Sequence, residues 1–200
     1  MKWLPTLAAV ILLASSAHAQ TLHGEALVKA LRQGGYVIVM RHASSPAEVP
    51  DSRTANADNI HRERQLDAKG RASATAMGNA LRELKIPIGD VLSSPTYRAL
   101  ETVRYAKLGD PLTFDELGDR SQSMQGVTDA QAAWLHKKAL QFPSGTNTII
   151  VTQLPNLTGA FRQLADGVED GEALIFGPPR IMSIATLVAR VKIEEWPAMR

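Results

Sequence analysis

Apolar positions along the chain alternate between helical and extended spacing. Residues 22–31 carry apolar side chains at helical spacing and end at a Gly-Gly pair, and the β-branched run 36–39 follows directly. Asp67 is then the expected N-cap of a helix whose apolar positions recur every three or four residues until Pro87. This alternation of helix and strand continues through the rest of the sequence.

The later expected elements are a strand over 90–93, a helix from Pro95 to about residue 108 with Ser94 as its N-cap, a helix over 128–140, a strand over 147–152, a helix over 155–164 and strands over 172–176 and 184–193. Such an order predicts an α/β fold with three layers, in which a mostly parallel central sheet is flanked by helices. Ligands of these sheets bind beyond the carboxyl ends of the strands.

The first nineteen residues have the pattern of a secretory signal peptide. Lys2 precedes an apolar stretch over residues 7–13, and the segment ends in Ala17-His18-Ala19. An uncleaved anchor is the alternative, but the apolar stretch is shorter than the about 20 residues that a spanning helix needs. We expect cleavage after Ala19, which leaves residues 20–200 as a single domain without a membrane attachment.

The charge and cysteine content narrow the possible partners and the compartment. The chain has 22 basic and 20 acidic residues, and loss of Lys2 with the signal leaves 21 against 20, a net charge of +1. This balance is not typical of a nucleic-acid binder. No cysteine is present, so neither disulfides nor thiolate metal sites can hold the fold. We expect a periplasmic protein, with full secretion as the alternative.

Residues 43–65 form an expected loop of unusual length. They show no periodicity and contain two prolines among clustered Asn, Asp and Ser residues. Loops this long in compact domains are usually functional or disordered. This segment is therefore a candidate for contacts with a ligand.

Two expected strands lead into cationic residues. The strand over 36–39 runs into Arg41-His42, and the strand over 90–93 leads to a helix whose first turn contains Arg98. Flanking cations disfavour the imidazolium form, so His42 should stay neutral and able to attack a phosphorus atom. The alternatives are an ordinary core histidine and a metal ligand, but no nearby histidine or carboxylate has ligand spacing.

Arg98 is unusual because a cation in the first helical turn opposes the helix dipole. The placement is favourable if a phosphate sits at the start of the helix and uses its free backbone N–H groups together with the guanidinium. A solvated surface arginine is the alternative.

Several motifs together resemble the histidine phosphatase superfamily, the phosphoglycerate-mutase-like fold, in its small exported bacterial form. They are Met40-Arg41-His42-Ala43, the segment 64–71, Ser93-Ser94-Pro95-Thr96-Tyr97-Arg98-Ala99 with Thr102, the segment 150–156, and the segment 171–174. The resemblance implies that His42 accepts the phosphoryl group, that water hydrolyses the phosphohistidine, and that Arg41 and Arg98 hold the phosphate. It implies no metal and no cofactor.

Gln153 departs from the family pattern, which places a second histidine there. A glutamine donates an N–H to a phosphate oxygen but carries no charge and moves no proton. Loss of one charged donor from such a site commonly costs about 10²–10³ in rate. His61, on the long loop, is a candidate for the missing cation, and a solvated His61 is the alternative.

The resemblance also implies an acidic residue that protonates the leaving oxygen. The candidates are Asp115, Glu116, Asp119 and Glu172. We favour Glu116, because it follows an expected short strand near Phe114, in the region where the family places its acid.

These observations predict a periplasmic phosphomonoesterase that acts through a phosphohistidine at His42. The alternative is a catalytically inactive protein that binds phosphate or a phosphorylated ligand, and a mutase is a weaker third. The expected partner is a phosphorylated small molecule or another phosphate-bearing ligand. The sequence leaves its identity, and the oligomeric state, open.

Overall fold

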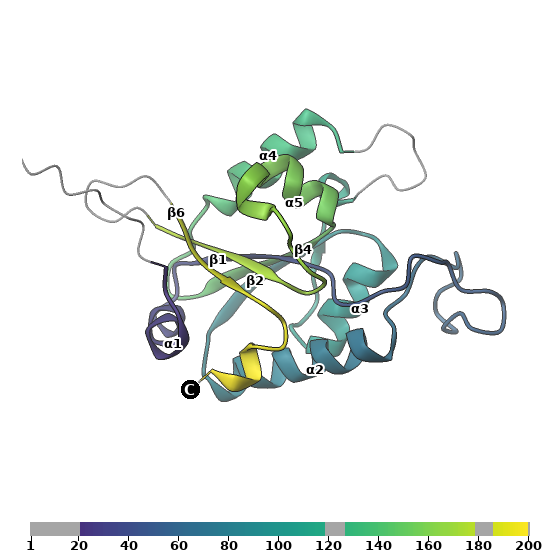
Figure 1. Cartoon of the computed structure of the whole chain (residues 1–200), viewed down its shortest axis with the longest axis horizontal. Helices are drawn as coiled ribbons and strands as arrows, with labels where there is room; N and C mark the ends of the chain where they lie inside the picture. Colours follow the sequence, from purple (N-terminus) through teal and green to yellow (C-terminus); the bar gives the residue numbers. More distant parts are fainter. Residues whose placement is uncertain (1–20, 119–126, 179–185, 200) are drawn as a thin grey trace, which may run out of the picture.

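The described residues form a six-stranded sheet between two layers of helices (Figure 1). The structure is a computed structural model and describes residues 21–118, 127–178 and 186–199. The expected signal peptide lies outside these residues. The strands are β1 (Val37–Arg41), β2 (Ile88–Ser93), β3 (Leu112–Thr113), β4 (Asn147–Thr152), β5 (Ala173–Gly177) and β6 (Thr186–Val191).

The strand order is β3-β2-β4-β1-β5-β6. The neighbours β3, β2, β4 and β1 run parallel, whereas β5 is antiparallel to both β1 and β6. This confirms the predicted mostly parallel sheet. The carboxyl ends of β2, β4 and β1 consequently lie side by side at one edge.

Helices cover both faces of the sheet (Figure 1). The helices α1 (Gly24–Arg32), α2 (Ala68–Glu83) and α3 (Tyr97–Ala106) cover one face, and α4 (Asp129–Ala139) and α5 (Leu154–Phe161) cover the other. Short 3₁₀ helices are η1 (Asp115–Leu117), η2 (Arg162–Ala165) and η3 (Trp196–Ala198).

The core is divided by the sheet into two hydrophobic clusters. Ile38 of β1 packs in the cluster with α1, α2 and α3, whereas Val37 and Val39 pack in the cluster with α4 and α5. Because both faces of the central strands are buried, β1 and β4 contain unbroken apolar runs, over residues 37–40 and 149–151, rather than an alternating pattern. No helix in the described ranges is long and apolar enough to cross a membrane.

The start of α2 lies against the segment that follows β1. Asp67 is the N-cap, as predicted, and its Oδ1 accepts a hydrogen bond of 2.6 Å from the Gly70 N–H. A Cβ at Gly70 would lie 2.1 Å from the carbonyl oxygen of Ser44, so only glycine permits this approach. Ser44 also donates its hydroxyl to Asp67 at 2.7 Å, which fixes the chain just beyond His42.

The start of α3 differs from the prediction. The helix begins at Tyr97 with Thr96 at the N-cap position, rather than at Pro95 with Ser94 as the cap. The reason is a local turn in which the Thr96 N–H donates to the Ser94 hydroxyl at 3.2 Å. This bond keeps Pro95 outside the helix and places Arg98 in the first helical turn.

Candidate active site

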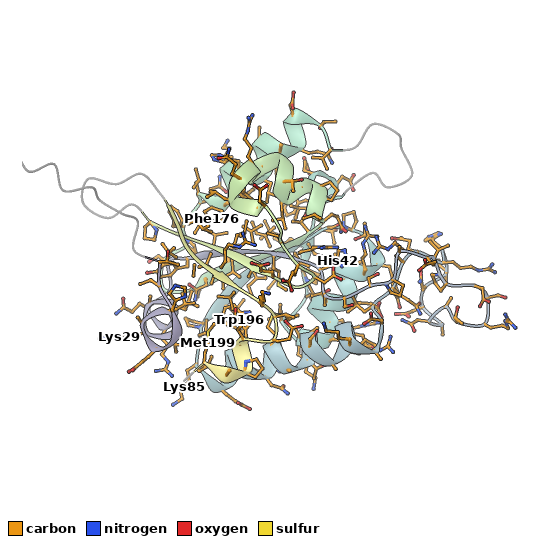
Figure 2. The ribbon with its side chains drawn as sticks, in the orientation of Figure 1. Lys29, His42, Lys85, Phe176, Trp196 and Met199 are labelled. Carbon is orange, nitrogen blue, oxygen red and sulfur yellow. The ribbon has the colours of Figure 1, made fainter. Side chains whose placement is uncertain are left out.

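Three chain segments predicted to carry the site meet at one edge of the sheet. The His42 N–H donates to the Thr152 carbonyl at 3.0 Å, and the Ser94 N–H donates to the Val151 carbonyl at 2.9 Å. The segments that follow β1 and β2 are therefore hydrogen-bonded to the carboxyl end of β4, which leads directly to Gln153. Figure 2 shows His42 inside the molecule, at the end of the sheet nearest the 43–65 segment.

His42 is held as a neutral imidazole. Its side chain is buried, and its Nδ1 lies 2.7 Å from the Ala43 carbonyl oxygen. A carbonyl only accepts hydrogen bonds, so the proton of the neutral ring sits on Nδ1 and Nε2 keeps its lone pair. Burial lowers the pKa of His42 to about 3, and the charges of Arg98, Arg41 and Arg64 act in the same direction.

Thr102 connects His42 to the helix that carries Arg98. Its Oγ1 accepts a hydrogen bond of 3.0 Å from the Ala43 N–H and donates one of 2.9 Å to the Arg98 carbonyl. Thr102 and Ala43 are both fully buried. The sequence motif contains Thr102, but its contact with Ala43, 59 residues away, has no local sequence pattern.

Arg98 and Gln153 contact each other directly. The Arg98 Nε donates to Gln153 Oε1 at 2.8 Å, and Gln153 Nε2 donates to the Thr96 hydroxyl at 2.8 Å. Arg98 is 2% exposed and Gln153 is 1% exposed. The amide of Gln153 thus links the guanidinium to the start of α3.

Arg41 is oriented by the loop that precedes β5. Its Nη2 lies 2.7 Å from Asp170 Oδ1, and its Nη1 donates to the Val168 carbonyl at 3.2 Å. Its Nε is buried and has no hydrogen-bond partner in the described part of the chain. Such an orphaned donor is costly, and an anion oxygen would satisfy it. Asp170 was not among the predicted site residues, because it is far from Arg41 in sequence.

The sequence predicts that free backbone N–H groups at the start of α3 bind a phosphate, but one of these groups already has a partner within the chain. The Tyr97 N–H donates to Glu63 Oε2 at 3.0 Å. A carboxylate of the chain itself therefore occupies this donor and offsets the helix dipole that Arg98 opposes. A bound phosphate would have to rely on side chains more than on this helix start.

The sequence of residues 37–143 matches the family model for the histidine phosphatase superfamily (branch 1). The chain belongs to the histidine phosphatase superfamily. The matched range contains Arg41, His42, Arg98 and Glu116, whereas Gln153 lies beyond it. No curated protein matches the sequence.

Several solved structures share the fold of this chain. The protein histidine phosphatase SixA, complexed with tungstate, is 16% identical with a TM-score of 0.57, over 80% of this chain and 98% of that one. SixA from Agrobacterium tumefaciens is 14% identical with a TM-score of 0.55, over 79% and 98%. A mutant phosphoserine phosphatase from Entamoeba histolytica, in complex with phosphoserine, is 10% identical with a TM-score of 0.52, over 80% and 98%.

The remaining site candidates of this superfamily member lie in different surroundings. Glu116 belongs to η1 and is half-buried, and its carbonyl accepts a hydrogen bond of 3.1 Å from Asn156 Nδ2. Glu172 is paired with Arg190 at 2.7 Å and accepts the Glu169 N–H at 2.9 Å, which is a structural arrangement at the start of β5. Asp119 lies outside the described residues.

His61 and Arg64 lie on the same loop but differ in environment. His61 is exposed, and no hydrogen bond or ion pair of its side chain is found among the described residues. Arg64 instead donates to the carbonyls of Pro46 at 2.6 Å and Ser45 at 3.0 Å, and its charge acts on His42. The role of His61 stays a prediction, and Arg64 is the loop cation that sequence analysis did not single out.

The long loop is tied to α3 by a buried carboxylate. Glu101 accepts the Leu66 N–H at 2.6 Å and the Asn56 side-chain N–H at 2.8 Å, and it is 1% exposed. The Tyr97 hydroxyl donates to Asp58 further along the loop. The segment is thus ordered against the same helix that carries Arg98.

Across the described ranges, no group of three or more His, Cys, Asp or Glu side chains is placed to hold a metal ion.

Proposed function

We propose that the protein is an exported phosphomonoesterase that acts through a phosphohistidine at His42. The observation that carries this proposal is the state of His42, a buried and neutral imidazole whose Nε2 lone pair is available beside Arg98. An imidazole of this kind is a competent nucleophile toward phosphorus.

In the first step, His42 Nε2 attacks the phosphorus atom of a phosphate monoester. The N–P bond forms as the P–O bond to the leaving group breaks, and Arg98 and Arg41 neutralise the charge on the transferred group. The buried Nε of Arg41 supplies a donor that lacks a partner within the described residues. Gln153 can donate the second N–H of its amide, because the first is already bound to Thr96.

In the second step, water attacks the phosphohistidine and the N–P bond breaks. Inorganic phosphate leaves, and His42 returns to its neutral form. Glu116 is the proposed acid that protonates the leaving oxygen in the first step and accepts a proton from water in the second. We also propose that His61 is a second contact to the phosphate. Its exposed side chain would reach the site by a movement of the 43–65 loop toward His42.

A phosphate-bearing ligand is consistent with the similar structures, which contain tungstate or phosphoserine. The proposed location is the periplasm, and it rests on the signal-like pattern of residues 1–19 and the absence of cysteine. The proposed reaction requires no metal and no cofactor.

The second candidate function is a phosphate-binding protein without turnover. Gln153 favours it, because the amide is uncharged and is already bonded to both Arg98 and Thr96. Such a site could retain an anion yet stabilise the transition state poorly.

Turnover of 4-nitrophenyl phosphate by the mature protein separates the two functions. We expect hydrolysis by the wild type that is abolished in His42→Ala. Hydrolysis that appears only in Gln153→His would instead support the binding protein. Binding of inorganic phosphate, measured by calorimetry on the same samples, shows whether an inactive protein keeps its anion site.

A further inference from the structure

The turn over residues 115–118, called here the η1 turn, has two local backbone hydrogen bonds, from the Leu117 N–H to the Phe114 carbonyl and from the Gly118 N–H to the Asp115 carbonyl, both at 3.0 Å, and is held further by buried side chains. Asn156 Nδ2 donates to the carbonyls of Glu116 and Gly118, at 3.1 Å in each case. Gln131 Nε2 donates to the carbonyls of Asp115 at 3.3 Å and Gly118 at 3.1 Å. These donors come from α5 and α4, which are far from the turn in sequence.

A third donor completes the set. The Thr152 hydroxyl, at the end of β4, donates to the Leu117 carbonyl at 2.8 Å. Every carbonyl of the η1 turn therefore accepts a hydrogen bond from a side chain. Asn156 and Thr152 are fully buried and Gln131 is 5% exposed, so water does not compete easily for these bonds.

The η1 turn lies against the two segments that carry Arg98 and Gln153. Thr152 directly precedes Gln153, and the Asn156 N–H donates to the Gln153 carbonyl at 3.1 Å. On the other side, a Cβ at Gly118 would lie 4.0 Å from Cδ of Pro95, in the segment that leads to Arg98. The turn thus places Glu116 at the edge of the sheet where His42 lies.

Asn156 also has an unsatisfied atom. Its Oδ1 is buried and has no hydrogen-bond partner among the residues that the structure describes. A buried acceptor without a partner is costly for stability, and such groups are rare in folded proteins. The fold nevertheless keeps an amide at this position, and its two donated bonds both go to the η1 turn.

We propose that Asn156, assisted by Gln131 and Thr152, is a positioning residue that fixes the η1 turn so that Glu116 can protonate the leaving group. This inference rests on the proposed function. A general acid must be held within a narrow range of distance and direction, and a turn fixed by buried donors from three elements meets that need.

The test compares two esters that differ in their demand for an acid. Phenyl phosphate has a poor leaving group that needs protonation, whereas 4-nitrophenyl phosphate has a good one that does not. We expect Asn156→Ala to lose about tenfold more kcat/KM on phenyl phosphate than on 4-nitrophenyl phosphate. Glu116→Gln should show the same pattern, and the double variant should be no worse than Glu116→Gln alone.

Asn147→Ala is the matched control. Asn147 is an equally buried amide at the opposite end of β4, and its Nδ2 donates to the carbonyls of Leu31 at 2.8 Å and Pro87 at 2.9 Å. Its removal should destabilise the fold but leave the ratio between the two esters unchanged. Gln131→Ala serves as the second test variant if Asn156→Ala does not fold.

Amide hydrogen exchange gives a readout that does not need turnover. The N–H groups of Leu117 and Gly118 should exchange about tenfold faster in Asn156→Ala, while those of β4 keep their protection. Unchanged exchange, or an equal loss of activity on both esters, would overturn the inference alone. A wild-type protein that hydrolyses neither ester would overturn the proposed function and the catalytic purpose of the turn together.

Discussion

Arg98 and Gln153 are joined by a hydrogen bond of 2.8 Å from the guanidinium Nε to the amide Oε1, although 55 residues separate them in sequence. A protonated histidine at position 153 could not accept this bond, and its charge would repel the guanidinium. The neutral amide of Gln153 accepts this bond without repelling the guanidinium, and the site carries one positive charge fewer than it would with a protonated histidine at position 153.

This pairing predicts the effect of a nearly isosteric change at the same position. Gln153→Glu keeps an oxygen acceptor for Arg98 but adds a negative charge close to the bound anion. We expect inorganic phosphate to bind at least about tenfold more weakly to this variant than to the wild type, because like charges repel strongly at a buried site. Titration calorimetry measures the change, and an unaltered affinity would place the anion away from Gln153.

The state of His42 predicts how stability depends on pH. Its pKa is about 3 in the folded chain, against 6.5 for a solvated histidine. As pH falls below 6.5, only the unfolded chain takes up this proton, so folding loses stability down to about pH 3. At about pH 4.5 the loss attributable to His42 is about 2 to 3 kcal/mol.

Urea unfolding of the wild type and His42→Gln at about pH 7 and about pH 4.5 tests this expectation. The variant lacks the titrating ring, so its stability should fall less between the two conditions by the amount stated above. The same decrease in both proteins would show that His42 titrates normally in the folded state.

Thr102 predicts a coupled loss of stability and activity. Thr102→Val keeps the shape but leaves the Ala43 N–H without its acceptor in a buried site. We expect a loss of about 1–3 kcal/mol of unfolding free energy and a lower kcat, because the chain after His42 is no longer tied to α3. Thr102→Ser retains the hydroxyl and should recover most of both quantities in thermal unfolding and turnover assays.

Asp170 predicts a non-additive effect with Arg41. Asp170→Ala removes the carboxylate 2.7 Å from the Arg41 guanidinium, so this cation should lose its fixed orientation and bind phosphate more weakly. Arg41→Ala should have a larger effect, and the double variant should resemble Arg41→Ala. Phosphate affinities of the four proteins form a cycle, and additive losses would mean that Asp170 does not act through Arg41.

Local periodicity was sufficient to predict the sheet but not the exact start of every helix. The strand over 147–152 has the predicted bounds, because a short segment rich in β-branched residues, preceded by Gly145 and followed by Pro155, favours a buried strand over a helix. The helix with Arg98 starts two residues later than predicted, because the hydroxyl of Ser94 binds the Thr96 N–H and closes a turn around Pro95. Such a side-chain bond competes with helix formation and is not visible in the pattern.

The candidate site was predictable where it lies next to strand ends. His42, Arg98 and Gln153 follow three apolar runs, and parallel strands bring such ends together. The partners that orient them were not predictable, since Asp170 contacts Arg41 and Glu63 contacts the Tyr97 N–H only through the tertiary fold. The two residues of each pair are far apart in sequence, and no periodic pattern relates their positions.

The sequence also did not show which basic residue of the 43–65 loop, His61 or Arg64, lies near His42. His61 and Arg64 are separated by only two residues in one irregular segment, yet His61 is exposed while Arg64 binds two carbonyls near His42. The direction of each side chain depends on how the loop docks on Glu101 and Tyr97 of α3. No periodic pattern in an irregular loop encodes that docking.

The central claim is that His42 carries the phosphoryl group, and trapping the intermediate tests it most directly. The mature protein is mixed with 4-nitrophenyl phosphate, quenched within milliseconds under alkaline conditions that preserve phosphohistidine, digested and analysed by mass spectrometry. We predict a single phosphoryl adduct on the peptide that contains His42, absent from His42→Ala. Turnover of the ester without any adduct on this peptide, or an adduct on a different residue, would contradict the account.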